Sequence, residues 1–149
     1  MLVPSADHPN SRRSITVENA TFKDCEFLRV QMQDFVFRDT VFKQCNFSGM
    51  QTWRVDFSNV IFEDCIMKCA QIRLFTNESD KIRFIRCNLT CSAISSDVDE
   101  EDIANQVKDD FGDDELNTVN RPICLFQECA LYGSSFTHVT VIFKNSVCI

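Results

Sequence analysis

The sequence of 149 residues is poor in the residues that usually make turns, with only three glycines and three prolines. Frequent turns in this chain must therefore use other residue types. Tyrosine and tryptophan are also scarce, with one of each, whereas phenylalanine occurs fourteen times. This one-sided aromatic content indicates that one kind of buried position is filled repeatedly by phenylalanine.

Several features of enzymes and membrane proteins are missing as well. No apolar run approaches the roughly 18 residues of a membrane span, and residues 1–14 lack the apolar segment of a signal peptide. The two histidines are His8 and His138, too few to build a Ser/His/Asp or Cys/His arrangement with the residues around them. No glycine-rich phosphate loop occurs. We therefore expect no catalytic residues, no cofactor and no nucleic-acid partner.

Residues 15–72 repeat with a period of five. In steps of five from Val17 to Ile72, every position is apolar except Thr52. The positions two residues earlier, from Ile15 to Ala70, are small or apolar except Thr40. Helices have a period of 3.6 and strands a period of 2, so this pattern is typical of neither. It indicates an internal repeat.

A unit of five with an inward pair at its centre and two residues before it can form one short extended edge and a corner. Four edges close a coil of twenty residues, and coils stack about 4.8 Å apart with parallel pairing. The pattern resembles the pentapeptide-repeat family. The matching units are Ala20–Phe22, Cys25–Phe27, Cys45–Phe47, Val55–Phe57, Val60–Phe62 and Cys65–Met67. The resemblance implies an all-β fold, a right-handed quadrilateral β-helix, which we expect to have about five coils.

The period is interrupted in a few places. The unit of Met50 and Thr52, beside Trp53, departs from the pattern, and Gly49 there suggests a bulge or an altered corner. Between Ile72 and Phe84 the phase shifts by two residues, which predicts a two-residue insertion at one corner. Repeats return after 121, and the final stretch either slips in phase or ends the stack. We expect a flexible tail at 1–14 and one domain over 15–149.

An insert at 95–120 carries most of the acidity. Residues 97–115 hold ten acids and one base, so the rest of the chain, with 12 acids and 14 bases, has a net charge of +2. Ser96 and Asp97 could cap a helix from about Val98 to Asp110, with its early acids near the positive helix terminus. A disordered acidic loop fits the same composition, and the sequence leaves both open.

Nine cysteines are unusual for this length, and five of them are predicted to form an inward ladder. Cys25, Cys45 and Cys65 are spaced by twenty, one coil, and the phase shifts add Cys87 and Cys129. Each thiol is expected to act as a small buried apolar group. Cys69 and Cys91 instead follow a unit centre by two residues, point outward and stack in adjacent coils. They could form a disulfide in an oxidising compartment or remain free thiols. A zinc site from Cys65, Cys69, Cys87 and Cys91 is disfavoured, because inward and outward sulfurs do not converge.

Four asparagines stand in Asn-X-Ser/Thr sequons: Asn19, Asn46, Asn77 and Asn88. They are possible glycosylation sites, although asparagine, serine and threonine are favoured at outward repeat positions in any case.

Three functions follow as hypotheses. The first is a non-enzymatic module that binds an unidentified protein partner, with the acidic insert as a specificity element. The second is a glycosylated luminal or extracellular domain, because the units FKDCEF, FKQCNF and FEDCIM are similar to the luminal β-helix of the synaptic-vesicle glycoprotein transporters. The third is a DNA mimic that binds a topoisomerase, as some pentapeptide proteins do. Its weakness is the positive charge of the repeats. An intact chain is expected in the cytoplasm, and a transporter fragment in a lumen or outside the cell.

Overall fold

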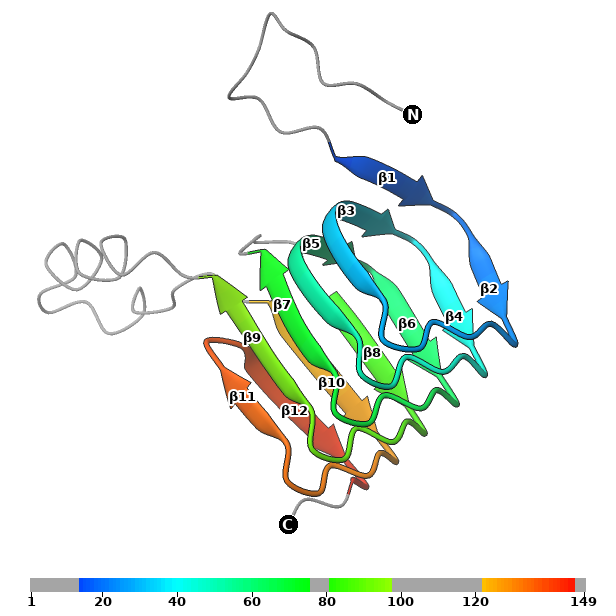
Figure 1. The fold of residues 1–149 in the computed structure, drawn as a ribbon. Coiled ribbons are helices and arrows are strands. Elements are labelled where there is room, and N and C mark those ends of the chain that lie inside the picture. The colour runs from blue at the N-terminus through cyan, green and yellow to red at the C-terminus, as the bar shows by residue number, and fades with distance from the viewer. Residues whose placement is uncertain (1–13, 76–80, 98–121, 147–149) are drawn as a thin grey trace, which may run out of the picture.

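The computed structural model describes residues 14–75, 81–97 and 122–146, and these form twelve strands in two parallel sheets (Figure 1). One sheet contains, in spatial order, β1 (Ile15–Glu18), β3 (Gln31–Arg38), β5 (Gln51–Ser58), β7 (Gln71–Phe75), β9 (Ala93–Asp97) and β11 (Ser135–Thr137). The other contains β2 (Thr21–Lys23), β4 (Val41–Lys43), β6 (Val60–Glu63), β8 (Lys81–Ile85), β10 (Ile123–Gln127) and β12 (Thr140–Lys144).

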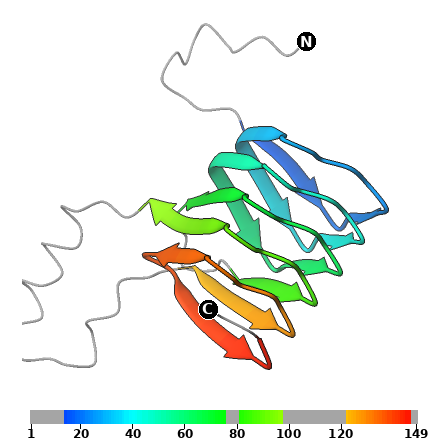
Figure 2. The same ribbon diagram turned by 60° about the horizontal axis from the view of Figure 1, so that its bottom comes forward.

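The chain alternates between the two sheets and winds into a β-solenoid of about five coils (Figure 2). Neighbouring strands pair with an offset of one coil, as Phe35 with Val55 and Val41 with Ile61. A further side of the coil is joined by single parallel bridges through Glu26, Asn46, Ile66, Asn88 and Ala130. The all-β solenoid expected from the five-residue period is thus confirmed.

The core is a set of stacked side chains along the solenoid axis. In the second sheet, phenylalanines of successive coils stack with ring centroids 4.8–5.6 Å apart: Phe22, Phe42, Phe62, Phe84, Phe126 and Phe143. Phe27 and Phe47 stack at 4.7 Å, and Phe37 and Phe57 at 5.4 Å. Each ring therefore sits on the same position of the neighbouring coil, which explains why one residue type recurs at the unit centre.

The corners turn without glycine because other residues adopt a left-handed backbone. The residue two positions after the unit centre has a positive φ in coil after coil, as in Asp24 (56°), Asn59 (55°) and Arg86 (51°). Asparagine and aspartate tolerate this region better than most residues, which accounts for their frequency there. Gly49 (72°) occupies the same corner position as Arg29 and Cys69, so the corner itself is ordinary, and the bulge expected in this unit lies between Gln51 and Val55, where the pairing with β7 shifts register.

The true irregularity lies one strand further on, where two corners are lost. Leu74 and Ser96 follow the centres Ile72 and Ile94 by two residues, yet both are buried in continuous strands. Gln51 pairs with Gln71, and Val55 pairs with Leu74. The stretch of β7 between these two pairs is therefore one residue shorter than the stretch of β5 that it faces. Val55 and Val60 are five positions apart, whereas their partners Leu74 and Ile82 are eight apart. The net change is the two-residue shift expected from the sequence.

The second interruption begins later than expected. Strand β9 continues through Asp97, which pairs with Phe75, so residues 95–97 belong to the sheet. Most of the expected insert at 95–120, with its possible helix, lies outside the described residues, as do residues 1–13 of the expected tail.

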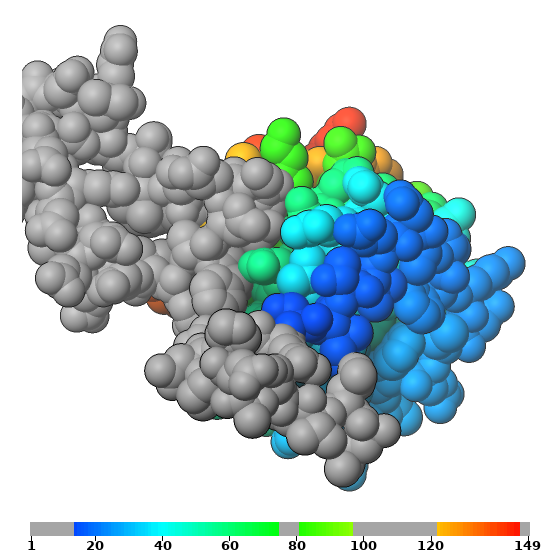
Figure 3. All heavy atoms as spheres, turned by 90° about the horizontal axis from the view of Figure 1, so that it is seen from above, coloured from blue at the N-terminus to red at the C-terminus, as the bar shows by residue number. Residues whose placement is uncertain are grey.

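The last coil also differs in phase from the sequence pattern. Val141 pairs with Cys124, and Phe143 pairs with Phe126. Phe143 is therefore the unit centre, in place of Val141. Both ends of the stack have a neighbour on one side only, and Ile15 (50% exposed) and Phe143 (45% exposed) lie there. Figure 3 shows the first coil (blue) across the near surface, in front of the later coils.

Candidate functional site

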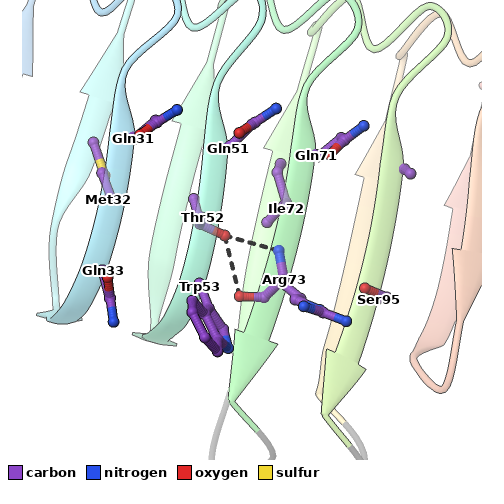
Figure 4. Close-up of a pocket in the computed structure, with 11 residues that line it drawn as sticks. Gln31, Met32, Gln33, Gln51, Thr52, Trp53, Gln71, Ile72, Arg73 and Ser95 are labelled. Carbon is purple, nitrogen blue, oxygen red and sulfur yellow. Dashed lines mark hydrogen bonds between the residues drawn. The ribbon is translucent and has the colours of Figure 1, made fainter.

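A shallow groove of about 640 Å³ crosses strands β3, β5, β7 and β9 on the outer face of the first sheet (Figure 4). It is lined by Gln31, Met32, Gln33, Gln51, Thr52, Trp53, Gln71, Ile72, Arg73, Ala93 and Ser95. Gln31, Gln51 and Gln71 are in register on neighbouring strands. The groove therefore runs along the stacking direction and spans several coils.

The groove has two rows of side chains. One row consists of the exposed Gln31, Gln51 and Gln71, whose amides project to the same side (Figure 4). Such amides offer both donors and acceptors. The second row contains Gln33, Trp53, Arg73 and Ser95, and among the described lining residues Arg73 is the one with a charged side chain. The surface is thus polar, nearly neutral and centred on an indole ring.

Trp53 is the single tryptophan of the chain and is 45% exposed. The guanidinium carbon of Arg54 lies 4.6 Å from the centroid of its ring, a cation–π contact. Tryptophan and arginine are both enriched among the few residues that supply most of the binding energy of protein interfaces.

Thr52 holds the floor of the groove in its irregular shape. Its hydroxyl accepts a hydrogen bond from the backbone N–H of Arg73 (2.8 Å) and donates one to the carbonyl of Arg73 (3.1 Å). Both hydrogen bonds lie where the ladder between β5 and β7 shifts register, so this side chain joins the two strands there. The threonine that breaks the apolar row is therefore required by the missing corner.

The groove adjoins the ends of β7 and β9, the two strands that precede residues 76–80 and 98–121, which lie outside the described part of the chain. Phe75 and Asp97, the last described residues before the two gaps, are paired across β7 and β9. Arg73 and Ser95, which line the groove, are paired two positions earlier in the same strands.

The structure places the five predicted ladder cysteines on one corner, with Cys45, Cys65, Cys87 and Cys129 buried and Cys25 half-buried in the end coil. Each buried thiol donates to the carbonyl of a phenylalanine in the previous coil. The acceptors are Phe22 for Cys45 (3.5 Å), Phe42 for Cys65 (3.3 Å), Phe62 for Cys87 (3.1 Å) and Phe84 for Cys129 (3.1 Å). Burial raises the pKa of the Cys45 thiol to about 11. Hydrogen bonds to Cys129 and Cys65, together with burial, raise the pKa of Cys87.

The ladder has a sixth member that the sequence pattern missed. The hydroxyl of Ser146 donates to the carbonyls of Phe126 (3.1 Å) and Lys144 (3.3 Å), as a thiol does one coil earlier. Ser92 and Ser134 make the equivalent bond, to Met67 and Leu89, on another corner. The small inward position is therefore a general site for a short donor.

Cys69 and Cys91 are exposed free thiols at left-handed corners of adjacent coils, with φ of 55° and 59°. Among the described residues, no group of three or more histidine, cysteine or acidic side chains could hold a metal ion. His138 is exposed at a corner.

The sequon asparagines lie on different parts of the surface. Asn19 is exposed, and Asn77 falls outside the described residues. The side-chain oxygen of Asn46 accepts from the backbone N–H of Ser48 (3.0 Å). That of Asn88 accepts from the backbone N–H (3.1 Å) and hydroxyl (2.6 Å) of Thr90. Single parallel bridges join Asn46 to Ile66 and Ile66 to Asn88. The two asparagines therefore occupy equivalent positions along the stack, in one column with Ile66 between them.

The groove was not predicted from the sequence, although two signals pointed to it. Glutamine recurs with the coil period at 31, 51 and 71, always just before a unit centre, and the sole tryptophan lies beside them. The five-residue period identifies the residues that point inward, but it does not distinguish one outward residue from another. The three glutamines and the tryptophan were therefore not singled out.

Comparisons with known proteins add little. No protein-family model matches the chain, and a search of curated proteins finds no match either. Among solved structures, the chain is similar to QnrB1, a plasmid-mediated fluoroquinolone resistance protein. The TM-score is 0.34 at 11% sequence identity, over 88% of this chain and 70% of that one. So low a score supports no inference about function. The described residues contain no helix with the length and apolar character of a membrane span.

Proposed function

We propose that this protein is a non-enzymatic module that binds a protein partner through the groove around Trp53. The observation that carries the proposal is an exposed tryptophan on a rigid sheet, flanked by Arg54 and by hydrogen-bonding glutamines. Strands paired on both sides hold these groups in fixed positions, so little conformational entropy is lost on binding. A concave surface whose described residues carry two cations, Arg73 in the lining and Arg54 beside Trp53, suits a polar peptide segment better than a nucleic acid.

The test is a comparison of the proteins captured by three forms of the full chain. Trp53→Ala should lose the specific partner, with at least a tenfold weaker affinity. Tyr132→Ala, which removes a similarly exposed aromatic side chain (42%) at a distant corner, should keep it. Because Trp53 is the only tryptophan, its fluorescence should change when the purified partner binds. Capture that is unaffected by Trp53→Ala would contradict the proposal.

The contribution of the acidic insert can be separated from that of the groove. Residues 98–121 are replaced by a short Gly/Ser linker. Asp97 is kept because Ser96 is buried and its hydroxyl donates to the carbonyl of His138. If the linker variant loses the partner and Trp53→Ala keeps it, the insert and not the groove recognises the partner.

The hypothesis of a glycosylated luminal or extracellular domain rests on the sequons, of which Asn46 and Asn88 lie in one column. Expression in a secretory system and glycosidase digestion test it, and unmodified sequons would count against it. The topoisomerase hypothesis is weaker because the net charge outside residues 97–115 is +2. If an excess of the protein leaves DNA supercoiling by the topoisomerase unchanged, the topoisomerase hypothesis is excluded.

A further inference from the structure

Cys69 and Cys91 occupy the same position in neighbouring coils. The backbone N–H of Cys69 donates to the carbonyl of Thr90 (2.9 Å), and that of Cys91 donates to the carbonyl of Tyr132 (2.7 Å). Adjacent positions in a parallel ladder are about 4.8 Å apart, within the 4.4–6.8 Å between Cα atoms that a disulfide requires.

The side chains of this column lean toward the following coil. A Cβ placed on Gly133 would lie 3.4 Å from the sulfur of Cys91, and one placed on Gly49 would lie 3.2 Å from Cγ of Arg29. All members of the column share the left-handed backbone. By the same lean the sulfur of Cys69 would point toward Cys91, and a rotation of the Cys91 side chain about χ1, away from Gly133, would bring the two sulfurs together.

We propose that Cys69 and Cys91 form a disulfide crosslink between the third and fourth coils on exposure to a small-molecule disulfide. In the first step, one thiolate attacks the oxidant, forms a mixed disulfide and releases one thiolate of the oxidant. In the second, the other cysteine thiolate attacks the cysteine sulfur of the mixed disulfide, forms the protein disulfide and releases the second thiolate of the oxidant. Two protein thiols are oxidised, their two protons are taken up by the two released thiolates, and the oxidant is thereby reduced to two thiols.

The remaining described cysteines are poorly placed to compete. Cys45, Cys65, Cys87, Cys124 and Cys129 are buried, and Cys25 is half-buried. The crosslink would close a ring over residues 69–91, which contains β7, β8 and the irregular coil. A ring of this size should raise the melting temperature by about 10 °C.

The experiment uses the full chain, reduced and then treated with glutathione disulfide, followed by alkylation and nonreducing tryptic mapping. Cleavage after Lys68, Arg73, Arg86 and Lys108 places Cys69 in peptide 69–73 and Cys91 in peptide 87–108. The expected product is these two peptides joined, with the mass of two hydrogens lost. Because peptide 87–108 also holds Cys87, the matched variants are Cys91→Ser, which should abolish the product, and Cys87→Ser, which should keep it.

A product that survives Cys91→Ser would overturn the proposal, as would covalent dimers or separate glutathione adducts on Cys69 and Cys91. The melting temperature is an independent measurement, and it does not depend on whether the Cys87→Ser variant folds. Oxidation should raise the melting temperature of the natural sequence and leave that of Cys69→Ser unchanged. Equal shifts in both would also exclude the crosslink.

Discussion

At the scale of single residues, the small inward position of each unit combines packing with hydrogen bonding. Cysteine, serine and threonine all place a short donor against carbonyls there, as in Cys65, Ser92 and Thr40. A buried polar atom is tolerated when its partner is in place, so these residues fit among alanine and valine. Thiols were selected for size, and their hydrogen bonds follow from the coil geometry.

Cys65 tests this interpretation, since its thiol lies 3.3 Å from the carbonyl of Phe42 and 3.4 Å from that of Glu63. Cys65→Ser should cost less than about 1 kcal/mol of unfolding free energy, because its hydroxyl reaches the same acceptors. Cys65→Ala should cost about 1–2 kcal/mol, since it leaves a small cavity and loses the donor. Urea unfolding measures both. A larger loss for serine than for alanine would contradict the prediction.

At the scale of the strand, the register shift between β5 and β7 depends on one side chain. Thr52 accepts a hydrogen bond from the backbone N–H of Arg73 and donates one to its carbonyl, at the point where the ladder between β5 and β7 shifts register. Thr52→Val keeps the shape of the side chain and removes the hydroxyl. It should therefore lower the unfolding free energy by about 1–3 kcal/mol.

Thr52→Ser is the matched control, because it keeps the hydroxyl and should recover most of the stability. Hydrogen exchange of the Arg73 amide supplies a local readout and should speed up in the valine variant alone. Equal stability of the valine and serine variants would show that the hydroxyl is not needed.

Ion pairs join neighbouring coils on the outside of the second sheet. Arg86 donates to Asp64 (2.8 and 3.2 Å) and to Glu63 (2.7 Å) in the previous coil. The hydrogen bonds from Arg86 lower the pKa of Asp64. Since its pKa is lower in the folded state, Asp64 contributes stability above the ordinary carboxyl pKa of about 3.9. The contribution disappears as the pH falls through the lowered value.

Melting temperatures of the natural sequence and of Arg86→Gln should therefore differ near neutral pH and converge in acid. The difference should be small because the pair is exposed, and high salt should reduce it. A difference that persisted at pH 2 would assign the effect of Arg86 to packing instead of charge.

At the scale of the whole molecule, the solenoid is a stack in which each coil contacts its neighbours, with stability shared among adjacent repeats. Strand β11 pairs with β9, and β10 pairs with β8, across the gap at 98–121. The stack is thus continuous on both sides of the insert.

Replacement of residues 98–121 by a short linker should consequently preserve the β-rich circular dichroism spectrum. The melting temperature should change by only a few degrees, because shortening a connection alters the closure entropy slowly. Loss of cooperative unfolding would show that the insert is part of the folded unit.

The sequence by itself determined the repeat and its inward positions. Side chains at Phe42, Cys65 and their equivalents recur because identical coils stack, and the offset between Ile72 and Phe84 revealed a net insertion of two residues. The sequence could not locate the lost corners at Leu74 and Ser96, since an apolar or small residue fits either a corner or a strand. It also left open whether the final stretch slips in phase or ends the stack, and pairing with β10 selects a slip in phase, with Phe143 as the unit centre.

The candidate site depended on tertiary structure for a different reason. Gln31, Gln51 and Gln71 are each twenty positions apart, with Trp53 close in sequence to Gln51 alone, and only the stacking of coils brings all four onto one face. Their role depends on exposure and mutual geometry, which a five-residue period does not encode. Burial constrains the inward residues to one size and polarity, so the sequence shows them, whereas outward residues become a surface only after the coils are assembled.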